Sequence, residues 1–156
     1  MNINFVAMGK LKESYFREAC EEYRKRLSAF AGVKVIEPEP AFLPQNPSPA
    51  QISQALEKEA DKLRGVAKGY KIAMCIEGKT LSSEELSEKL RGISLNFSEI
   101  SFIVGSSYGL DESFKRECDL RLSMSPMTFP HSLARVMLFE QVYRAMSINA
   151  NSKYHK

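Results

Sequence analysis

The sequence has few of the residues that bind metals or form disulfide bonds: three cysteines and two histidines among 156 residues. Cys20, Cys75 and Cys118 are odd in number, far apart, and show no Cys-x-x-Cys spacing. We therefore expect reduced, structural thiols. His131 and His155 add too few ligands for a structural zinc site, so we expect no metal.

Long apolar runs are also absent, and none approaches the length of a membrane span. The first eight residues read as a strand with no basic leader before it. We expect a cytoplasmic protein that does not bind membranes. The chain shows no internal repeat and no linker, and its 44% hydrophobic content is enough for one core. A single domain over residues 1–156 follows.

Glycine is sparse where a nucleotide site would need it, and the charge is small. Gly9 follows the first predicted strand alone, whereas a dinucleotide fingerprint needs Gly-x-Gly-x-x-Gly, so a Rossmann site is not expected.

A net charge of +3 does not by itself indicate nucleic-acid binding. The C-terminal part is nevertheless basic and could meet phosphate, although solvated charge at a chain end is the commoner explanation. From His131 onward Arg135, Arg144, Lys153 and Lys156 face one acid, Glu140.

Hydrophobic periodicity alternates between strand and helix along the chain. This alternation predicts an α/β fold, mostly a parallel sheet with helices on both faces. On the residues alone, a flavodoxin-like sheet is the favoured arrangement. Strands are expected at 2–8, 33–37, 70–76, 99–104 and 119–124, and helices at 11–30, from Pro49, from Ser82, from Asp111, and at 133–148.

Several helix ends are marked by their residues. Ser48 with Gln51 and Ser82 with Glu85 have capping-box spacing, and Gly92 is placed to end the helix that Ser82 begins. Five of the seven prolines crowd into residues 38–49, which predicts an irregular segment, either a loop over a site or a surface excursion.

Three strand ends are candidates for a ligand site, since ligands of parallel sheets bind at the carboxyl ends of strands. They are residues 74–78, 105–109 and 124–129. In the third, Pro126 and Pro130 predict a stiff, extended loop. Such a loop suits a binding site, although a plain strand-to-helix connector explains it equally well.

The last helix is apolar at nearly every position from Leu133 to Ile148. It should be buried on most sides, in the core or against a second copy of the chain, and we favour a homodimer. Arg135 and Arg144 lie within this apolar helix and need partners. They are either buried structural residues or contacts to phosphate.

These loops and the C-terminal segment together resemble the SPOUT-class methyltransferases, in particular the ribosomal RNA large subunit methyltransferase H group. The resemblance covers the whole chain. It rests on Val6–Lys12, Phe102–Leu110, Leu122–His131, Arg135, Glu140–Ala145 and Tyr154–Lys156.

The resemblance implies an enzyme that uses S-adenosylmethionine to methylate N3 of a pseudouridine in a hairpin loop of 23S rRNA on the assembled ribosome. It also implies a homodimer with a C-terminal trefoil knot, which no periodicity shows. The implied catalytic residues are Tyr154, His155 and Arg144, with His131 helping to shape the cofactor loop. The implied cofactor-binding residues are Met74, Gly105, Met124, Ser125, Pro126, Met127, Thr128 and Phe129.

Two positions depart from the family pattern. Relatives usually have a second glycine where Ser106 stands, and often an acidic residue where Cys75 stands. Two other functions remain open from the residues: a non-catalytic ribosome-binding module, and a flavodoxin-like nucleotide-binding protein.

Overall fold

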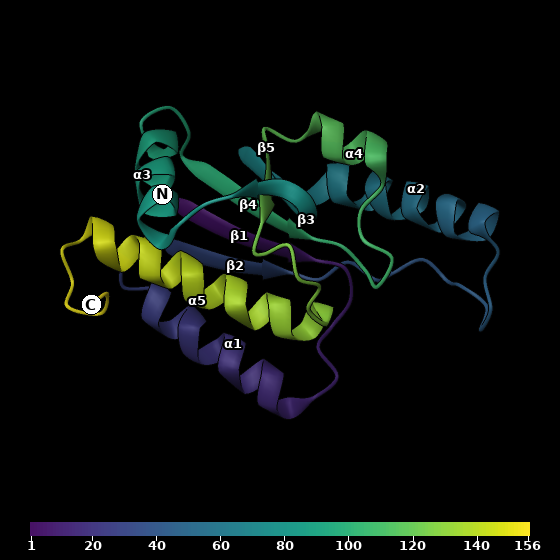
Figure 1. Cartoon of the computed structure of the whole chain (residues 1–156), viewed down its shortest axis with the longest axis horizontal. Coiled ribbons are helices and arrows are strands. Elements are labelled where there is room, and N and C mark those ends of the chain that lie inside the picture. Colours follow the sequence, from purple (N-terminus) through teal and green to yellow (C-terminus); the bar gives the residue numbers. More distant parts are fainter.

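Strands and helices alternate along the whole chain in the computed structural model, which describes residues 1–156 (Figure 1). The elements are β1 (Asn2–Ala7), α1 (Ser14–Leu27), β2 (Gly32–Ile36), α2 (Pro49–Val66), β3 (Tyr70–Thr80), α3 (Ser83–Ser94), β4 (Glu99–Val104), α4 (Glu112–Glu117), β5 (Leu120–Ser123) and α5 (His131–Asn149).

The five strands form one parallel sheet in the order β2-β1-β4-β3-β5. The predicted α/β class and all five strands are confirmed. The flavodoxin-like arrangement is wrong, because that sheet has the order 2-1-3-4-5. Here β4 pairs with β1 along its full length, Asn2 to Ala7 against Glu99 to Val104, and so separates β1 from β3.

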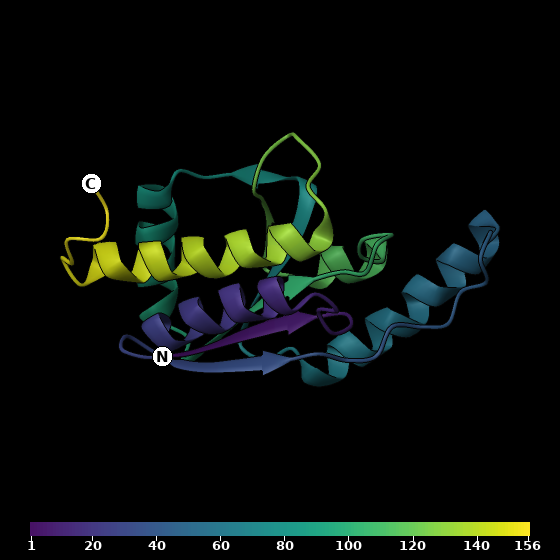
Figure 2. The same cartoon turned by 90° about the horizontal axis from the view of Figure 1, so that it is seen from below.

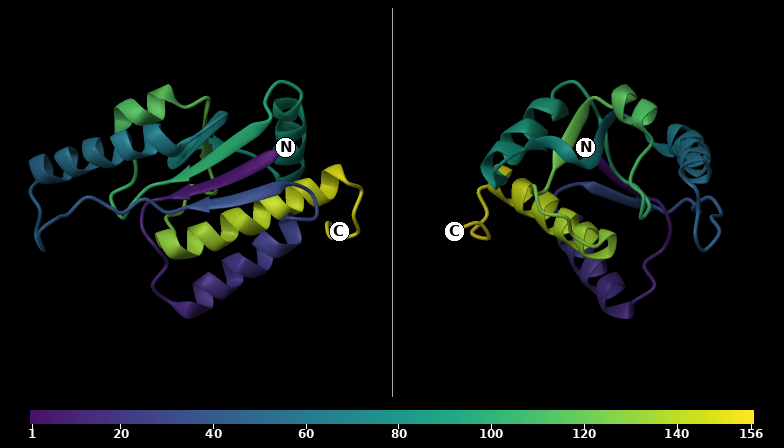
Figure 3. Two further views of the ribbon diagram at one scale, coloured as in Figure 1. Left: turned by 180° about the vertical axis from the view of Figure 1, so that it is seen from behind. Right: turned by 45° about the vertical axis from the view of Figure 1, so that its right-hand side comes forward.

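Helices cover both faces of the sheet, as the alternating side chains of a strand require (Figures 2 and 3). Ile3 and Phe5 point toward α1, α3 and α5, and the Phe5 ring stacks on Phe139 of α5 with 3.7 Å between centroids. Val6 points to the other face, where α2 and α4 pack. None of these helices combines the length and the apolar character needed to span a membrane.

β3 runs farther than its apolar pattern indicates. It continues to Thr80, four residues beyond the predicted end at residue 76, and pairs with β5 a second time after an irregularity between Met74 and Lys79. Gly78 permits this close approach. A Cβ at this position would lie 2.7 Å from the backbone carbon of Leu122. The distal part of β3 is thereby held against β5, beneath the loop that leads to α5 (Figure 2).

Both predicted capping boxes are present, with Ser48 bonded to Gln51 and Ser82 bonded to Glu85 in both directions. The prediction that Gly92 ends α3 is wrong. The helix continues to Ser94, because a glycine stops a helix only when it takes the left-handed conformation, and Gly92 does not.

The proline-rich segment between β2 and α2 is irregular, as predicted. It runs alongside α2, whose first turns extend beyond the sheet (Figures 1 and 2). The segment is tied to the helix where Lys62 Nζ donates a hydrogen bond to the Glu39 carbonyl at 2.6 Å.

α5 lies between α1 and α3 and has one buried face, formed by Leu138, Phe139, Val142 and Ala145 among others. The prediction that this helix is buried on most sides holds for that face only. Six other apolar side chains of α5 are exposed or half-buried in one chain: Leu133, Val136, Met137, Tyr143, Met146 and Ile148. Of these, Val136, Tyr143 and Met146 also pack partly against the core.

Candidate active site

A large cavity lies at the carboxyl ends of β3, β4 and β5, because these neighbouring parallel strands all end at the same edge of the sheet. Its volume is about 770 Å³, within the range of small-molecule sites. The three strand ends that the sequence marks as candidates for a ligand site meet in this cavity. Its walls are residues 74–77, 104–110, 123–125 and 127–131, with Lys115 and Ala134.

All but one of the predicted cofactor residues line this cavity. Met74 ends the apolar part of β3, Gly105 follows β4, and Met124, Ser125, Met127, Thr128 and Phe129 follow β5. Pro126 lies in the same loop with its side chain exposed and outside the cavity wall. Its part in this site is therefore to fix the shape of the loop.

The loop after β5 is held by its own hydrogen bonds as well as by its prolines. Ser123 Oγ donates to the Ser125 carbonyl at 3.0 Å, and the Met127 N–H donates to Ser125 Oγ at 3.0 Å. The loop is thus more than a connector, because its shape is fixed while it forms a cavity wall. His131, the first residue of α5, also lies in this wall.

The glycines after β4 make a tight turn. Gly109 has φ of +82°, and its N–H bonds to the Ser106 carbonyl at 2.9 Å. A Cβ on Gly105 would lie 2.3 Å from the Gly109 carbonyl oxygen. The space beside Gly105 is therefore filled by the turn itself, which only a glycine permits.

Ser106, one of the departures from the family pattern, lies between this turn and α2. The carboxyl of Glu59, a buried residue of α2, lies near Ser106 and Ala41, and its Oε2 has no hydrogen-bond partner. Burial raises the pKa of Glu59, and the neighbouring Ser106 hydroxyl and Ala41 N–H only partly offset it. Ser106 thus lies where the cavity turn meets α2 and the proline-rich segment.

Charge within the cavity is concentrated in one pair, Glu77 and Lys115, which form an ion pair. The sequence analysis named neither as a site residue, although Glu77 lies in the candidate strand end 74–78. Glu77 could have been found, because it follows an apolar strand directly at its carboxyl end. Lys115 could not, because nothing in the sequence shows which way a six-residue helix turns its side chains. Where the resemblance predicts an acid at position 75, the carboxylate of this cavity is that of Glu77.

The predicted catalytic residues Arg144, Tyr154 and His155 lie together, but none of them lines the cavity. Arg144 Nε and Nη2 donate to Glu140 Oε1 at 3.0 and 2.5 Å, and its guanidinium carbon lies 4.7 Å from the centre of the Tyr154 ring. Arg144 Nη1 lies 3.4 Å from His155 Nδ1. We call Glu140, Arg144, Tyr154 and His155 the tail cluster.

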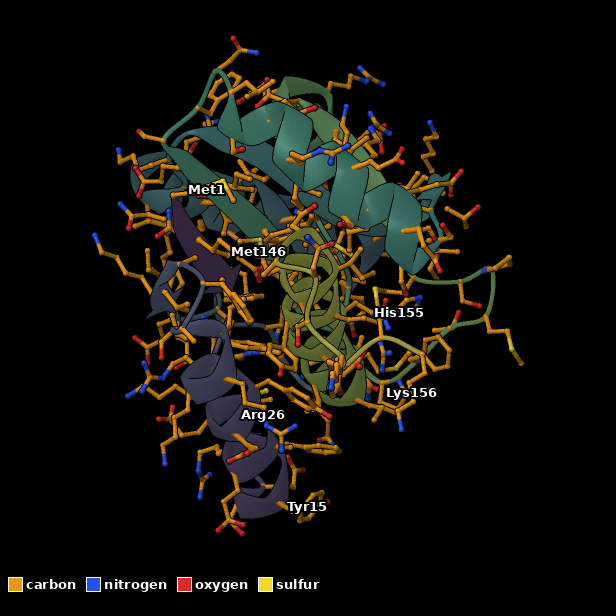
Figure 4. The ribbon with its side chains drawn as sticks, turned by 90° about the vertical axis from the view of Figure 1, so that its left-hand side faces the viewer. Met1, Tyr15, Arg26, Met146, His155 and Lys156 are labelled. Atoms are coloured by element: carbon orange, nitrogen blue, oxygen red, sulfur yellow. The ribbon has the colours of Figure 1, made fainter.

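The tail cluster is anchored beside α3 and α5 (Figure 4). His155 Nε2 lies 2.7 Å from Glu84 Oε1 at the start of α3. Burial and, to a smaller extent, the bond to Glu140 raise the pKa of Tyr154 to about 12. From His131 at the cavity to Glu140 is nine residues, or about 14 Å along a helix. Within one chain the tail cluster therefore lies away from the cavity.

The basic C-terminal part is less open than its composition suggests. Arg135 is 6% exposed and bonds to the Gly9 carbonyl at 3.0 Å and to Glu37 at 2.5 Å. Arg144 is bonded to Glu140. Only Lys153 and Lys156 are exposed cations of this segment.

No cluster of three His, Cys, Asp or Glu side chains could hold a metal ion.

Comparison with known proteins gives a consistent result. A family model described as "Predicted SPOUT methyltransferase" matches residues 1–155. The chain is 50% identical over 156 residues to the ribosomal RNA large subunit methyltransferase H of Caldicellulosiruptor bescii, covering 99% of both chains. It is 45% identical over 159 residues to the protein of the same name from Ruminiclostridium cellulolyticum, covering all of both chains.

Among solved structures, a probable methylase family protein from Haemophilus influenzae Rd KW20 has the same fold. Its TM-score is 0.55 at 12% identity, over 99% of this chain and 70% of that one. With a family model matching nearly every residue and relatives aligned from end to end, the chain belongs to the SPOUT methyltransferase family.

Proposed function

We propose that this protein transfers a methyl group from S-adenosylmethionine to N3 of a pseudouridine in a hairpin loop of 23S rRNA, acting on the assembled ribosome in the cytoplasm. The observation that carries the proposal is the end-to-end identity with ribosomal RNA large subunit methyltransferase H proteins. A cavity of suitable size at the strand ends supports it. Family membership argues against a non-catalytic module, and the strand order against a flavodoxin-like protein.

The cavity fits an adenosyl cofactor in size and in chemistry. Apolar and aliphatic side chains, including Met74, Met127 and Phe129, would contact the adenine, while serine hydroxyls and backbone groups of the two stiff loops would bind the ribose. The cofactor supplies a methyl group bound to a sulfonium sulfur. The thioether that leaves is neutral, so its departure needs no acid. The protein's task is therefore to position the two reactants and to accept the N3 proton.

The tail cluster supplies the groups suited to the second reactant. In this proposal Tyr154 and His155 contact the target base and Arg144 binds phosphate or steadies developing charge. His155 is the residue type suited to accepting a proton near neutral pH. The raised pKa of Tyr154 keeps its hydroxyl protonated, so it serves as a hydrogen-bond donor rather than as a base.

The separation of cavity and tail cluster supports a homodimer in which each cavity is completed by the tail of the other copy. The half-exposed apolar side chains of α5, with Phe16 and Tyr23 of α1 beside them, supply the apolar face that such a dimer needs. The resemblance also implies the trefoil knot. The loop that crosses the distal part of β3 before α5 is the segment through which such a threading would pass (Figure 2).

Methylation of ribosomes tests the proposal. Purified protein, isotopically labelled S-adenosylmethionine and ribosomes from cells lacking the protein should give one labelled 23S rRNA fragment by mass mapping, and that mass should be absent before the protein is added. Label in no fragment would contradict the enzyme assignment. Label at another base, or only in free rRNA, would contradict the substrate.

A further inference from the structure

We infer that Lys115 and Glu77 form the subsite for the amino-acid end of S-adenosylmethionine, with Lys115 binding the α-carboxylate and Glu77 the α-ammonium. This inference rests on the proposed cofactor, and it concerns residues outside the loops that the resemblance assigns to cofactor binding. The amino-acid end carries one charge of each sign. Its recognition in a cavity calls for one cation and one anion close together.

The cavity offers one such pair. Among its lining side chains Lys115 and Glu77 are the only ones that carry a full charge at neutral pH, apart from the titratable His131. The rest are apolar side chains, hydroxyl groups, a thiol and glycines. A zwitterion bound here therefore meets its opposite charges at this pair and nowhere else in the wall.

Lys115 is held in place, which favours recognition over a flexible surface contact. Its side chain is 12% exposed, and its Nζ bonds to Glu77 and, at 2.9 Å, to Glu112. An ammonium has three N–H donors, so one remains for a ligand carboxylate. Burial alone would lower the pKa of Lys115, but the two carboxylates together raise it, so the side chain is charged.

Glu77 has the complementary properties. Its carboxylate is half-exposed, and Lys115 is its one side-chain partner, so an oxygen is available to accept from a ligand ammonium. The bond to Lys115 lowers the pKa of Glu77, which keeps it ionised at neutral pH. Glu112 differs, because it lies outside the cavity wall and also pairs with Arg116 and Arg121.

Two ligands that differ only at the amino-acid end provide the test. S-adenosylhomocysteine carries that end, 5′-methylthioadenosine lacks it, and both contain an uncharged sulfur. Calorimetry of the wild type and of Lys115→Met should show about a tenfold loss of affinity for S-adenosylhomocysteine, as expected for one lost charge-assisted bond. Affinity for 5′-methylthioadenosine should change by less than about twofold. Glu77→Gln should show the same selective loss.

Arg116→Met is the matched control. Arg116 lies on the same helix and near the same Glu112, at 3.8 Å, but outside the cavity, so neither affinity should change. Equal losses for both ligands in Lys115→Met and Glu77→Gln, or no loss in either variant, would overturn the subsite. If Lys115→Met melts early, Glu77→Gln decides alone. Failure of the wild type to bind either ligand would instead overturn the proposed function.

Discussion

The Tyr154 hydroxyl donates a hydrogen bond to Glu140 Oε1 at 3.1 Å, and the same oxygen accepts from Arg144 at 2.5 Å. One carboxylate on α5 therefore holds two of the proposed catalytic side chains. It also influences the chemistry of the tyrosine, whose pKa burial and this bond together raise to about 12.

Replacing Glu140 by Gln should lower the pKa of Tyr154, because a neutral amide no longer opposes ionisation of the phenol. The pKa should stay above the ordinary tyrosine value, since burial, the larger cause, persists. Tyr154 is one of six tyrosines, and its titration is isolated from that of the others by difference: the ultraviolet titration of a protein that also carries Tyr154→Phe is subtracted from that of the same protein with Tyr154. An unchanged titration would show that the hydrogen bond to Glu140 is not formed in solution.

Gly78→Ala and Gly92→Ala should change stability in opposite directions. A Cβ at Gly78 would lie 2.7 Å from the Leu122 backbone, so the strands must separate, at a cost of about 1–3 kcal/mol. A Cβ at Gly92 meets nothing within 4 Å in the last turn of α3, and should stabilise the helix by about 0.5–1 kcal/mol. Urea denaturation of both variants measures this, and a loss in Gly92→Ala equal to that in Gly78→Ala would contradict the account.

Glu59→Gln should remove a pH-dependent loss of stability. The buried carboxyl has a pKa raised above its ordinary value of 4.5, chiefly by burial, so the folded state binds its proton more tightly than the unfolded state. By linkage, stability falls as the pH rises from about 4.5 through the raised pKa, then levels.

The glutamine variant lacks this proton, so its stability relative to the wild type should grow over the same pH interval. Urea denaturation at several pH values measures the difference in unfolding free energy between the variant and the wild type. The contributions of the other carboxylates are the same in both proteins and cancel in this difference. Parallel pH profiles for the two proteins would contradict the raised pKa.

Arg135→Met should cost about 3 kcal/mol of folding free energy, because it leaves Glu37 and the Gly9 carbonyl without their buried partner. The residue lies outside the cavity, so the folded variant should still bind S-adenosylhomocysteine. Thermal melting and calorimetry test the two halves separately. Wild-type melting with lost methylation would reverse the assignment and give Arg135 a direct role in the reaction.

Much of the fold was predictable because its signals are local. Capping boxes at Ser48 and Ser82 and the alternation within each strand depend on residues near one another in sequence. The position of β4 between β1 and β3 depends on which strands pair, and no local pattern encodes it. The extension of β3 to Thr80 depends likewise on the approach of β5 to Gly78.

The site divides in the same way. The stiff loop from Met124 to Pro130 was readable from its prolines, and its place at a strand end from the α/β pattern. The direction of Lys115 on α4, the position of Ser106 near Glu59, and the separation of the tail cluster from the cavity are tertiary relationships. They required the structure.

Subunit mixing tests the central claim, that each cavity acts with the tail of the other copy. One variant lacks residues 154–156. The other, Thr128→Trp, fills the cavity and should fail to bind S-adenosylhomocysteine in calorimetry. Each should be inactive alone.

After subunit exchange in equal amounts, half of the dimers are mixed and each mixed dimer has one complete site. Because only half of the dimers have a site, and each of these has one of two, ribosomes should be methylated at about a quarter of the wild-type rate. No activity in the mixture, with mixed dimers present, would contradict it.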